Sequence, residues 1–191
     1  MKYLLPLLLV ALLLAGCNSN KDPLNQFRYA VNDSLIVAGR AGAMVLQEPL
    51  PPTLDNYSME TYEQVVMEEG IDVTYRYCTV KDSAHTVARL TLGDGDIVLA
   101  IRLFSRDFHT MSGIKVGSLV QDAIGLLPQP NLWYSYVSEL FVLESPKLPG
   151  VQFIIDPSAY RGSADLTGND MVPLAPSDFD AHAQILEVRL Y

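Results

Sequence analysis

The hydrophobic residues of this chain follow two patterns, a continuous run at the start and alternation further on. Residues 4–15 are almost all apolar, with Lys2 before them and a polar stretch from Asn18 to Asp22 after them. One positive residue followed by about a dozen apolar ones is typical of a secretory signal peptide. The run is shorter than the ~20 apolar residues that a membrane-spanning helix needs. The pattern therefore predicts an exported protein.

The apolar run ends in a lipobox, the motif at which bacterial lipoproteins are cleaved and acylated. It consists of Leu14, Ala15, Gly16 and Cys17. Small residues fit the peptidase cleft, and the thiol accepts diacylglycerol; several acyl chains on one residue anchor a protein stably. We therefore expect a signal peptide over 1–16, lipidation (including palmitate) at Cys17 and a polar tether over 17–28.

The residue after the lipobox cysteine predicts the location of the protein. It is Asn18 and not the aspartate that keeps bacterial lipoproteins in the inner membrane. We expect an outer-membrane lipoprotein on the periplasmic face in a Gram-negative bacterium, with the lipid bilayer as partner through acylated Cys17.

Beyond the tether, period-two alternation predicts antiparallel strands. Strands are expected over 73–80 and 85–92, and Asp94 with Gly95 is typical of a two-residue hairpin turn. Residues 54–69 fit either a helix or a strand, with a strand slightly favoured over 62–67. The side chains expected to share one face after the hairpin turn are Ile97, Leu99, Ile101 and Leu103.

A single helix is predicted at about 118–126, where apolar residues recur at helical spacing. Ser118 is a good N-cap, and Gly125 or Pro128 ends the apolar series. The stretch 157–180 is rich in glycine and proline, which predicts a long loop. Further strands are expected over 133–137, 140–144, 151–155 and 185–190. The fold class is α+β, a mainly antiparallel β-sheet with one short helix packed on it, in a single periplasmic domain over 29–191.

Charge and cysteine content narrow the possible partners. The formal charge is −9 and becomes −10 when Lys2 leaves with the signal peptide. Nucleic acid and anionic lipid surfaces would repel such a domain, whereas a basic protein would be attracted.

Cys78 is the second cysteine of the chain. A thiol left alone in an oxidising compartment is expected to be buried as a small apolar residue.

The sequence holds no pattern that predicts a catalytic or metal site. His85, His109 and His182 are far apart, without metal-ligand spacing. No Gly-x-Ser-x-Gly motif is present. We therefore expect no enzyme activity, no catalytic or metal-ligating residues and no cofactor.

Four residues are candidates for binding. Tyr134 and Tyr136 alternate along a predicted strand, and tyrosines that share an exposed face suit an interface. Core or cross-strand packing of the same aromatic residues is the competing interpretation. Tyr160 and Arg161 precede Gly162 in the long loop and form a possible inserting segment, as do residues 38–40.

Three places in the chain resemble a known family. They are residues 110–118 after the predicted hairpin, residues 160–162, and residues 176–178 with the closing strand 185–190. In this order they resemble the lipoproteins regulated by the envelope-stress sigma factor, sigma-E, a family of unknown function. The resemblance implies an outer-membrane location. It supplies no catalytic residues.

These observations predict a membrane-anchored bacterial lipoprotein of unknown molecular activity that binds another envelope component without catalysing a reaction. Two alternatives stay open. One is an inhibitor of a basic periplasmic enzyme such as lysozyme, which an acidic domain would attract by long-range electrostatics. The other is a periplasmic hydrolase with an unrecognised site.

Overall fold

The computed structural model describes residues 34–83, 85–167 and 170–191, which form one compact unit. The predicted signal peptide, Cys17 and the tether lie outside the described residues. The strands described are β1 (Leu35–Val37), β2 (Arg40–Ala41), β3 (Met44–Val45), β4 (Ser58–Glu68), β5 (Ile71–Lys81), β6 (Thr86–Leu92), β7 (Val98–Leu103), β8 (His109–Thr110), β9 (Asn131–Ser135), β10 (Leu140–Glu144), β11 (Val151–Ile155), β12 (Met171–Pro173) and β13 (Ile185–Leu190). The one described α-helix is α3 (Val120–Leu126), and short 3-10 turns are η1 (Asp94–Asp96), η2 (Pro157–Ala159) and η3 (Pro176–Asp178).

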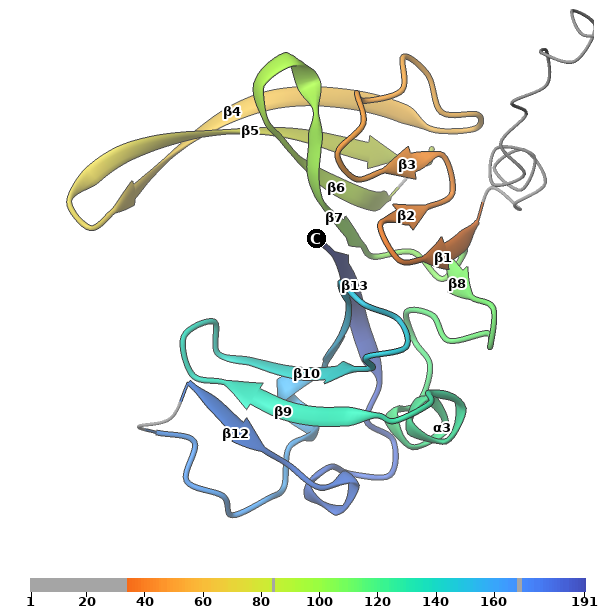
Figure 1. The fold of residues 1–191 in the computed structure, drawn as a ribbon, viewed down its shortest axis with the longest axis vertical. Helices are drawn as coiled ribbons and strands as arrows, with labels where there is room; N and C mark the ends of the chain where they lie inside the picture. Colours follow the sequence, from red (N-terminus) through yellow and green to blue (C-terminus); the bar gives the residue numbers. More distant parts are fainter. Residues whose placement is uncertain (1–33, 84, 168–169) are drawn as a thin grey trace, which may run out of the picture. The chain divides into compact units, whose positions relative to one another are not determined.

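The strands form two sheets (Figure 1). The larger sheet has nine strands in the order β12-β9-β10-β11-β13-β7-β6-β5-β4, and all neighbouring pairs are antiparallel. The smaller sheet has the order β3-β2-β1-β8, in which β1 and β8 are parallel. The predicted α+β class, mainly antiparallel sheet with one short helix, is therefore confirmed.

The hydrophobic core lies on one face of the large sheet. Val120 and Ala123 of α3 are fully buried in it, as are Ile36 and Met44 of the small sheet. Cys78 is also fully buried there as a free thiol, as its isolation predicts. Burial raises the pKa of this thiol. Within the described residues, no helix is long and apolar enough to cross a membrane.

The predicted hairpin of β6 and β7 is present, but its turn and its register differ from expectation. The connection contains η1, in which Gly95 and Asp96 both adopt positive φ, so it is longer than a two-residue turn. The register also shifts where Leu92 pairs with Val98. As a result Val98 is buried and Leu99 is 42% exposed, so the expected face containing Leu99 was wrong.

The helix begins slightly later than predicted. Its N-cap is Leu119, which makes no side-chain capping bond. Ser118 was therefore wrong as the cap, because its hydroxyl accepts a hydrogen bond from the backbone of Lys115 instead. The helix ends at Leu126, before Pro128, as expected when the residue preceding proline is excluded from helical backbone.

Most of the remaining elements match the sequence patterns. The strands β10, β11 and β13 have the predicted bounds, and the strand interpretation of residues 62–67 is confirmed by β4. The long loop over 157–180 also contains the strand β12, which pairs with β9. The two-residue and three-residue strands of the small sheet were not predicted, because they are too short to show alternation.

Candidate binding surface

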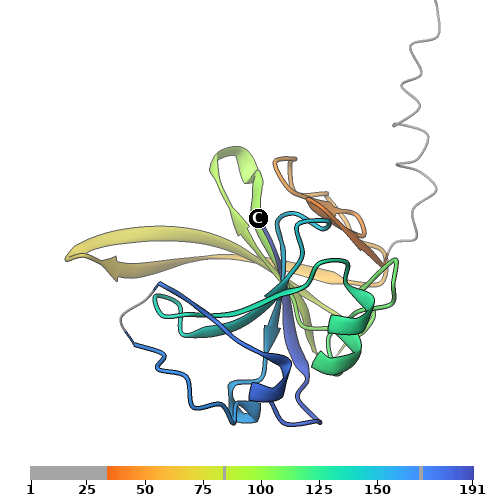
Figure 2. The same cartoon turned by 60° about the horizontal axis from the view of Figure 1, so that its bottom comes forward.

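The two longest strands form a hairpin, Ser58–Lys81, which we call the hairpin arm. Its turn consists of Glu69 and Gly70, which both have positive φ, as a two-residue hairpin turn of type I′ requires. β5 pairs with β6 only from Arg76 to Lys81. Among the described residues, the outer part of the arm is therefore a two-stranded ribbon, which extends away from β6 in two views (Figures 1 and 2).

The arm has one face toward the core and one face away from it. Cys78 and Val80 point into the core near its base. Side chains alternate along a strand, so Tyr75 and Tyr77 lie on the opposite face, together with Tyr62, which pairs with Tyr77. We call these three residues the tyrosine ladder. The Tyr62 and Tyr77 rings are 5.5 Å apart, and the Tyr75 and Tyr77 rings are 6.2 Å apart.

The same face continues across the sheet as a row of arginines. Arg89, Arg102 and Arg189 are in register on β6, β7 and β13. Glu187, 7% exposed, accepts hydrogen bonds from the Arg102 Nε at 2.5 Å and the Arg189 Nε at 2.7 Å. Burial would raise the pKa of Glu187, but the hydrogen bonds from both arginines outweigh it and lower the pKa. Through its ion pair with Arg102, this carboxylate links β13 to β7.

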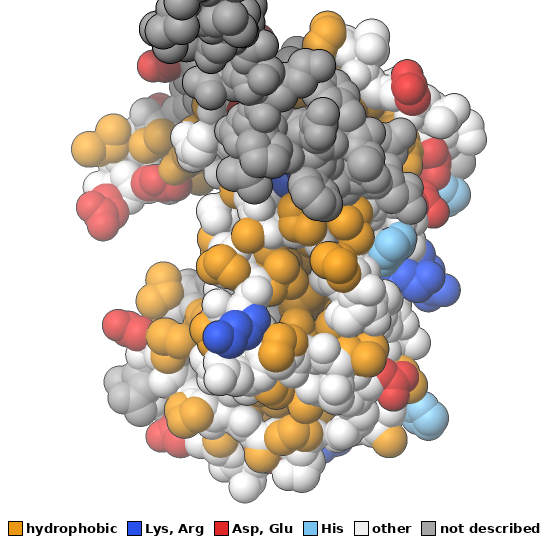
Figure 3. Space-filling model, turned by 45° about the vertical axis from the view of Figure 1, so that its right-hand side comes forward, with side chains coloured by type: hydrophobic (Ala, Val, Ile, Leu, Met, Phe, Trp, Pro, Cys, Tyr) orange, Lys and Arg blue, Asp and Glu red, His pale blue; other side chains and the backbone are white. Residues whose placement is uncertain are grey.

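The far end of the arm combines apolar and acidic side chains. We call residues 63–73 the acidic tip: they include four carboxylates and no lysine, arginine or histidine. Val65, Met67 and Ile71 are 61%, 74% and 68% exposed. In Figure 3 the arm protrudes at the upper left, where hydrophobic and acidic side chains lie together. Exposed apolar residues that gather on a surface are typical of interaction sites, so the tip is a candidate for one.

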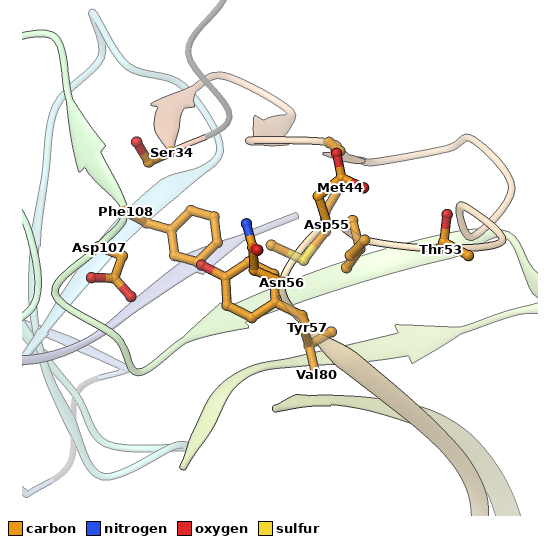
Figure 4. A pocket seen from close by; sticks show the side chains of 11 residues that line it. Ser34, Met44, Thr53, Asp55, Asn56, Tyr57, Val80, Asp107 and Phe108 are labelled. Carbon is orange, nitrogen blue, oxygen red and sulfur yellow. The ribbon is translucent and has the colours of Figure 1, made fainter. Parts of the chain in front are cut away.

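A cavity of about 620 Å³ lies where the small sheet meets the segment before β4 (Figure 4). Tyr57 and Phe108 form part of its wall, with ring centroids 6.4 Å apart. Burial raises the pKa of Tyr57, and the carboxylates of Asp107 and Asp82 raise it further. The described lining includes no histidine, cysteine, lysine or arginine, so it brings no histidine beside a serine and an acid. Its lining residues are Ser34, Ala43, Met44, Thr53, Leu54, Asp55, Asn56, Tyr57, Val80, Asp107 and Phe108.

The tyrosines predicted to bind have different surroundings. Tyr134 and Tyr160 both pack against Phe141, with ring centroids 4.9 Å and 4.8 Å away; the Tyr134 ring is tilted and the Tyr160 ring is stacked. Tyr160 also packs edge-on against Phe179. Tyr136 lies beyond the end of β9 and is 49% exposed. The structure thus brings Tyr134 and Tyr160 together in a partly buried aromatic cluster, apart from exposed Tyr136.

Arg161 forms hydrogen bonds and an ion pair within the loop in which it lies. Its guanidinium donates to the backbone carbonyls of Ser158 and Tyr160 and forms an ion pair with Asp180 at 3.3 Å.

Sequence reasoning missed the tyrosine ladder and the acidic tip as candidate sites. The signal that was available is the alternation of aromatic residues in β5 beside the exposed acidic turn.

The histidines are dispersed. His85 is exposed near Asp82, the His109 ring contacts the carbonyl of Thr110, and His182 lies in the exposed turn before β13. Within the described ranges, no group of three or more His, Cys, Asp or Glu side chains is arranged to hold a metal ion. The cavity beside the small sheet is also lined by none of these histidines.

The fold defines an α+β protein built on a nine-stranded antiparallel sheet. No protein-family model and no curated protein matches the sequence. Among solved structures the chain is similar to the uncharacterized protein yfeY from Escherichia coli, with a TM-score of 0.53 and 12% sequence identity. The match covers 81% of this chain and 97% of that one, and it shows a shared fold.

Proposed function

We propose that this protein is a non-enzymatic bacterial lipoprotein that holds a binding domain at the outer membrane, on its periplasmic face. The observation that carries the proposal is the hairpin arm. It exposes Val65, Met67 and Ile71 beside four carboxylates, on a ribbon that contributes nothing to the core beyond its base. A solvent-exposed two-stranded ribbon is marginally stable on its own, which favours a role in contact with a partner.

The anchor and location rest on the sequence. The lipobox at Cys17 and the following Asn18 support acylation and outer-membrane sorting. The resemblance to the sigma-E regulated lipoproteins supports the same location, and the shared fold with uncharacterized yfeY is compatible with it. The proposed partner is a protein or other component of the envelope, with cationic groups that complement the acidic tip.

Crosslinking in cells tests this proposal. A photoreactive residue is placed at Val65 in the full-length protein, and a matched one at Met111, which is 87% exposed and lies outside the arm. We expect a discrete adduct from position 65 and none from position 111. The same result from both positions, or no adduct at position 65, would contradict an arm-centred binding function.

An inhibitor of a basic periplasmic enzyme is a second candidate. The four carboxylates of the acidic tip favour it, because they would attract a cationic enzyme. The earlier suggestion that Arg161 leads an inserting loop has less support, since its guanidinium is engaged within its own loop. Salt-sensitive capture of lysozyme by the protein would support this candidate, and no capture at low salt would reject it.

A further inference from the structure

β4 is the terminal strand of the nine-stranded sheet. Its eleven residues, Ser58–Glu68, pair with β5 along their full length, and no second strand neighbours β4 in the described part of the chain. Such an edge carries a row of unpaired backbone donors and acceptors that another strand can join. Natural edges are often short or protected by proline, but this one is long and contains no proline.

The turn determines which backbone groups of β4 point outward. In a two-residue hairpin the residues that flank the turn, here Glu68 and Ile71, form a hydrogen-bonded pair. Because such pairs alternate along an antiparallel ladder, the peptide groups of Glu63, Val65 and Met67 point away from β5. These three residues therefore offer their amides and carbonyls at the open edge.

The charge of the edge selects among possible occupants. Two copies of β4 paired antiparallel about their midpoint would place Glu63 beside Glu63, and like charges directly opposite destabilise a strand pair. An anionic lipid surface would be repelled by the four carboxylates of the acidic tip. A cationic segment with apolar residues is complementary to both the carboxylates and the apolar side chains of Val65 and Val66.

We propose that the open edge of β4 accepts an extended, cationic segment of a partner protein as an added strand. The segment would set apolar side chains beside Val65 and Val66 and lysine or arginine beside Glu63 and Glu68. Backbone pairing supplies affinity, and the carboxylates set register and partner charge. This inference rests on the proposed binding function and specifies how that binding occurs.

A designed peptide provides the probe. Its sequence is Lys-Thr-Val-Val-Thr-Lys-Val-Thr-Lys. When this nonapeptide is aligned antiparallel to residues 60–68, its lysines lie opposite Glu60, Glu63 and Glu68. Binding to the full-length protein in detergent is measured by fluorescence anisotropy, and amide exchange by mass spectrometry. We expect saturable binding and about ten-fold slower exchange within Ser58–Glu68 at saturation. Binding without slower exchange in this segment, or no binding, would overturn the proposal.

Peptide variants separate strand pairing from simple charge attraction without altering the protein. Methylation of the peptide nitrogens at positions 2, 4 and 6 removes the donors that face β4, and we expect binding to be lost. Methylation at positions 3, 5 and 7 leaves those donors in place, and binding should remain. Equal effects of the two patterns, or equal binding by a peptide with glutamate in place of lysine, would reject the inference.

Protein variants locate the site. Glu63→Gln with Glu68→Gln removes two tip charges that face peptide lysines and should weaken peptide binding about five-fold, the effect of two exposed ion pairs. Asp122→Asn with Glu139→Gln removes two exposed charges elsewhere and should leave binding unchanged. If position 65 crosslinks to a partner in cells while the peptide fails to bind, the strand addition is refuted and the proposed function stands. If neither occurs, both fall.

Discussion

The hydroxyl of Tyr75 donates a hydrogen bond of 2.7 Å to the carboxylate of Glu68, across the end of the hairpin arm. This bond raises the pKa of Tyr75 and ties the two strands together next to the Glu69–Gly70 turn. In the described structure, no third strand pairs with this end of the arm. Local side-chain contacts therefore determine how well the tip is ordered.

Tyr75→Phe removes this hydrogen bond but keeps the ring. We expect faster amide exchange in residues 63–73 and an unchanged midpoint of global thermal unfolding, because the exposed tip adds nothing to the core. Hydrogen exchange and calorimetry measure the two effects. Tyr136→Phe, at an exposed tyrosine outside the arm, is the control. A lowered global midpoint for Tyr75→Phe would show that the arm is coupled to the core.

Glu187→Gln tests the carboxylate that joins the central strands. The variant leaves Arg102 and Arg189 without their anionic partner, and breaking a buried ion pair costs about 3 kcal/mol. We expect the free energy of unfolding from urea titration to fall by about this amount at pH 7. Glu139→Gln, on the surface, should change it by less than about 0.5 kcal/mol. Equal losses in the two variants would contradict the role assigned to Glu187.

The same carboxylate predicts a pH dependence of stability. Its pKa in the folded protein is lowered from the ordinary value of 4.5, so the folded state favours the charged form. The contribution is therefore complete well above pH 4.5 and is lost as the pH falls through the lower, folded pKa. Between pH 7 and pH 3, the wild type should lose more stability than Glu187→Gln. Parallel curves for the two proteins would show that another group is responsible.

Gly150→Ala should destabilise the pairing of β11 with β13. Gly150 has a φ of 71°, and an added Cβ would lie 2.5 Å from the backbone oxygen of Tyr191. Gly113→Ala is the matched control, because Gly113 has a φ of 85° with open space around the added atom. We expect a loss of about 1 kcal/mol for the control and a larger one for Gly150→Ala in urea unfolding. Equal losses would mean that the backbone at Tyr191 moves away from the added Cβ at little cost in free energy.

Cys17→Ser tests the anchor. The wild-type protein should incorporate labelled palmitate in cells and sediment with membranes, whereas the variant should do neither. Asn18→Asp should keep acylation and move the protein to the inner-membrane fraction on a density gradient. Labelling of Cys17→Ser would place the lipid elsewhere, and unchanged sorting of Asn18→Asp would remove the argument for the outer membrane.

Period-two alternation in the sequence predicted where the long strands lie, but not which of their faces meets the core. Val73, Tyr75 and Tyr77 have the composition of a buried face, yet the core contacts the alternate residues Cys78 and Val80. A register shift has no local signature in composition, which is why Leu99 was placed on the wrong face. The choice between faces depends on which distant elements cover the sheet.

The candidate site was harder to predict for the same reason. Tyr134 and Tyr160 are aromatic residues near loops, and the sequence alone does not show that both pack against Phe141. The acidic tip became recognisable when pairing showed that β6 ends at Arg76 and leaves the ribbon beyond it exposed. The exposure of the tip depends on how far β6 extends along β5, which the sequence of the tip itself does not show.

The limited pairing of β5 with β6 also has an evolutionary consequence. Substitutions in residues 63–73 meet few of the packing constraints that restrict residues in the core, since none of these side chains belongs to the buried cluster. New partner preferences can therefore arise at the end of the arm by changes of charge and apolar surface alone. The rest of the molecule would keep its folding stability while such changes accumulate, so the proposed recognition could change without a loss of stability.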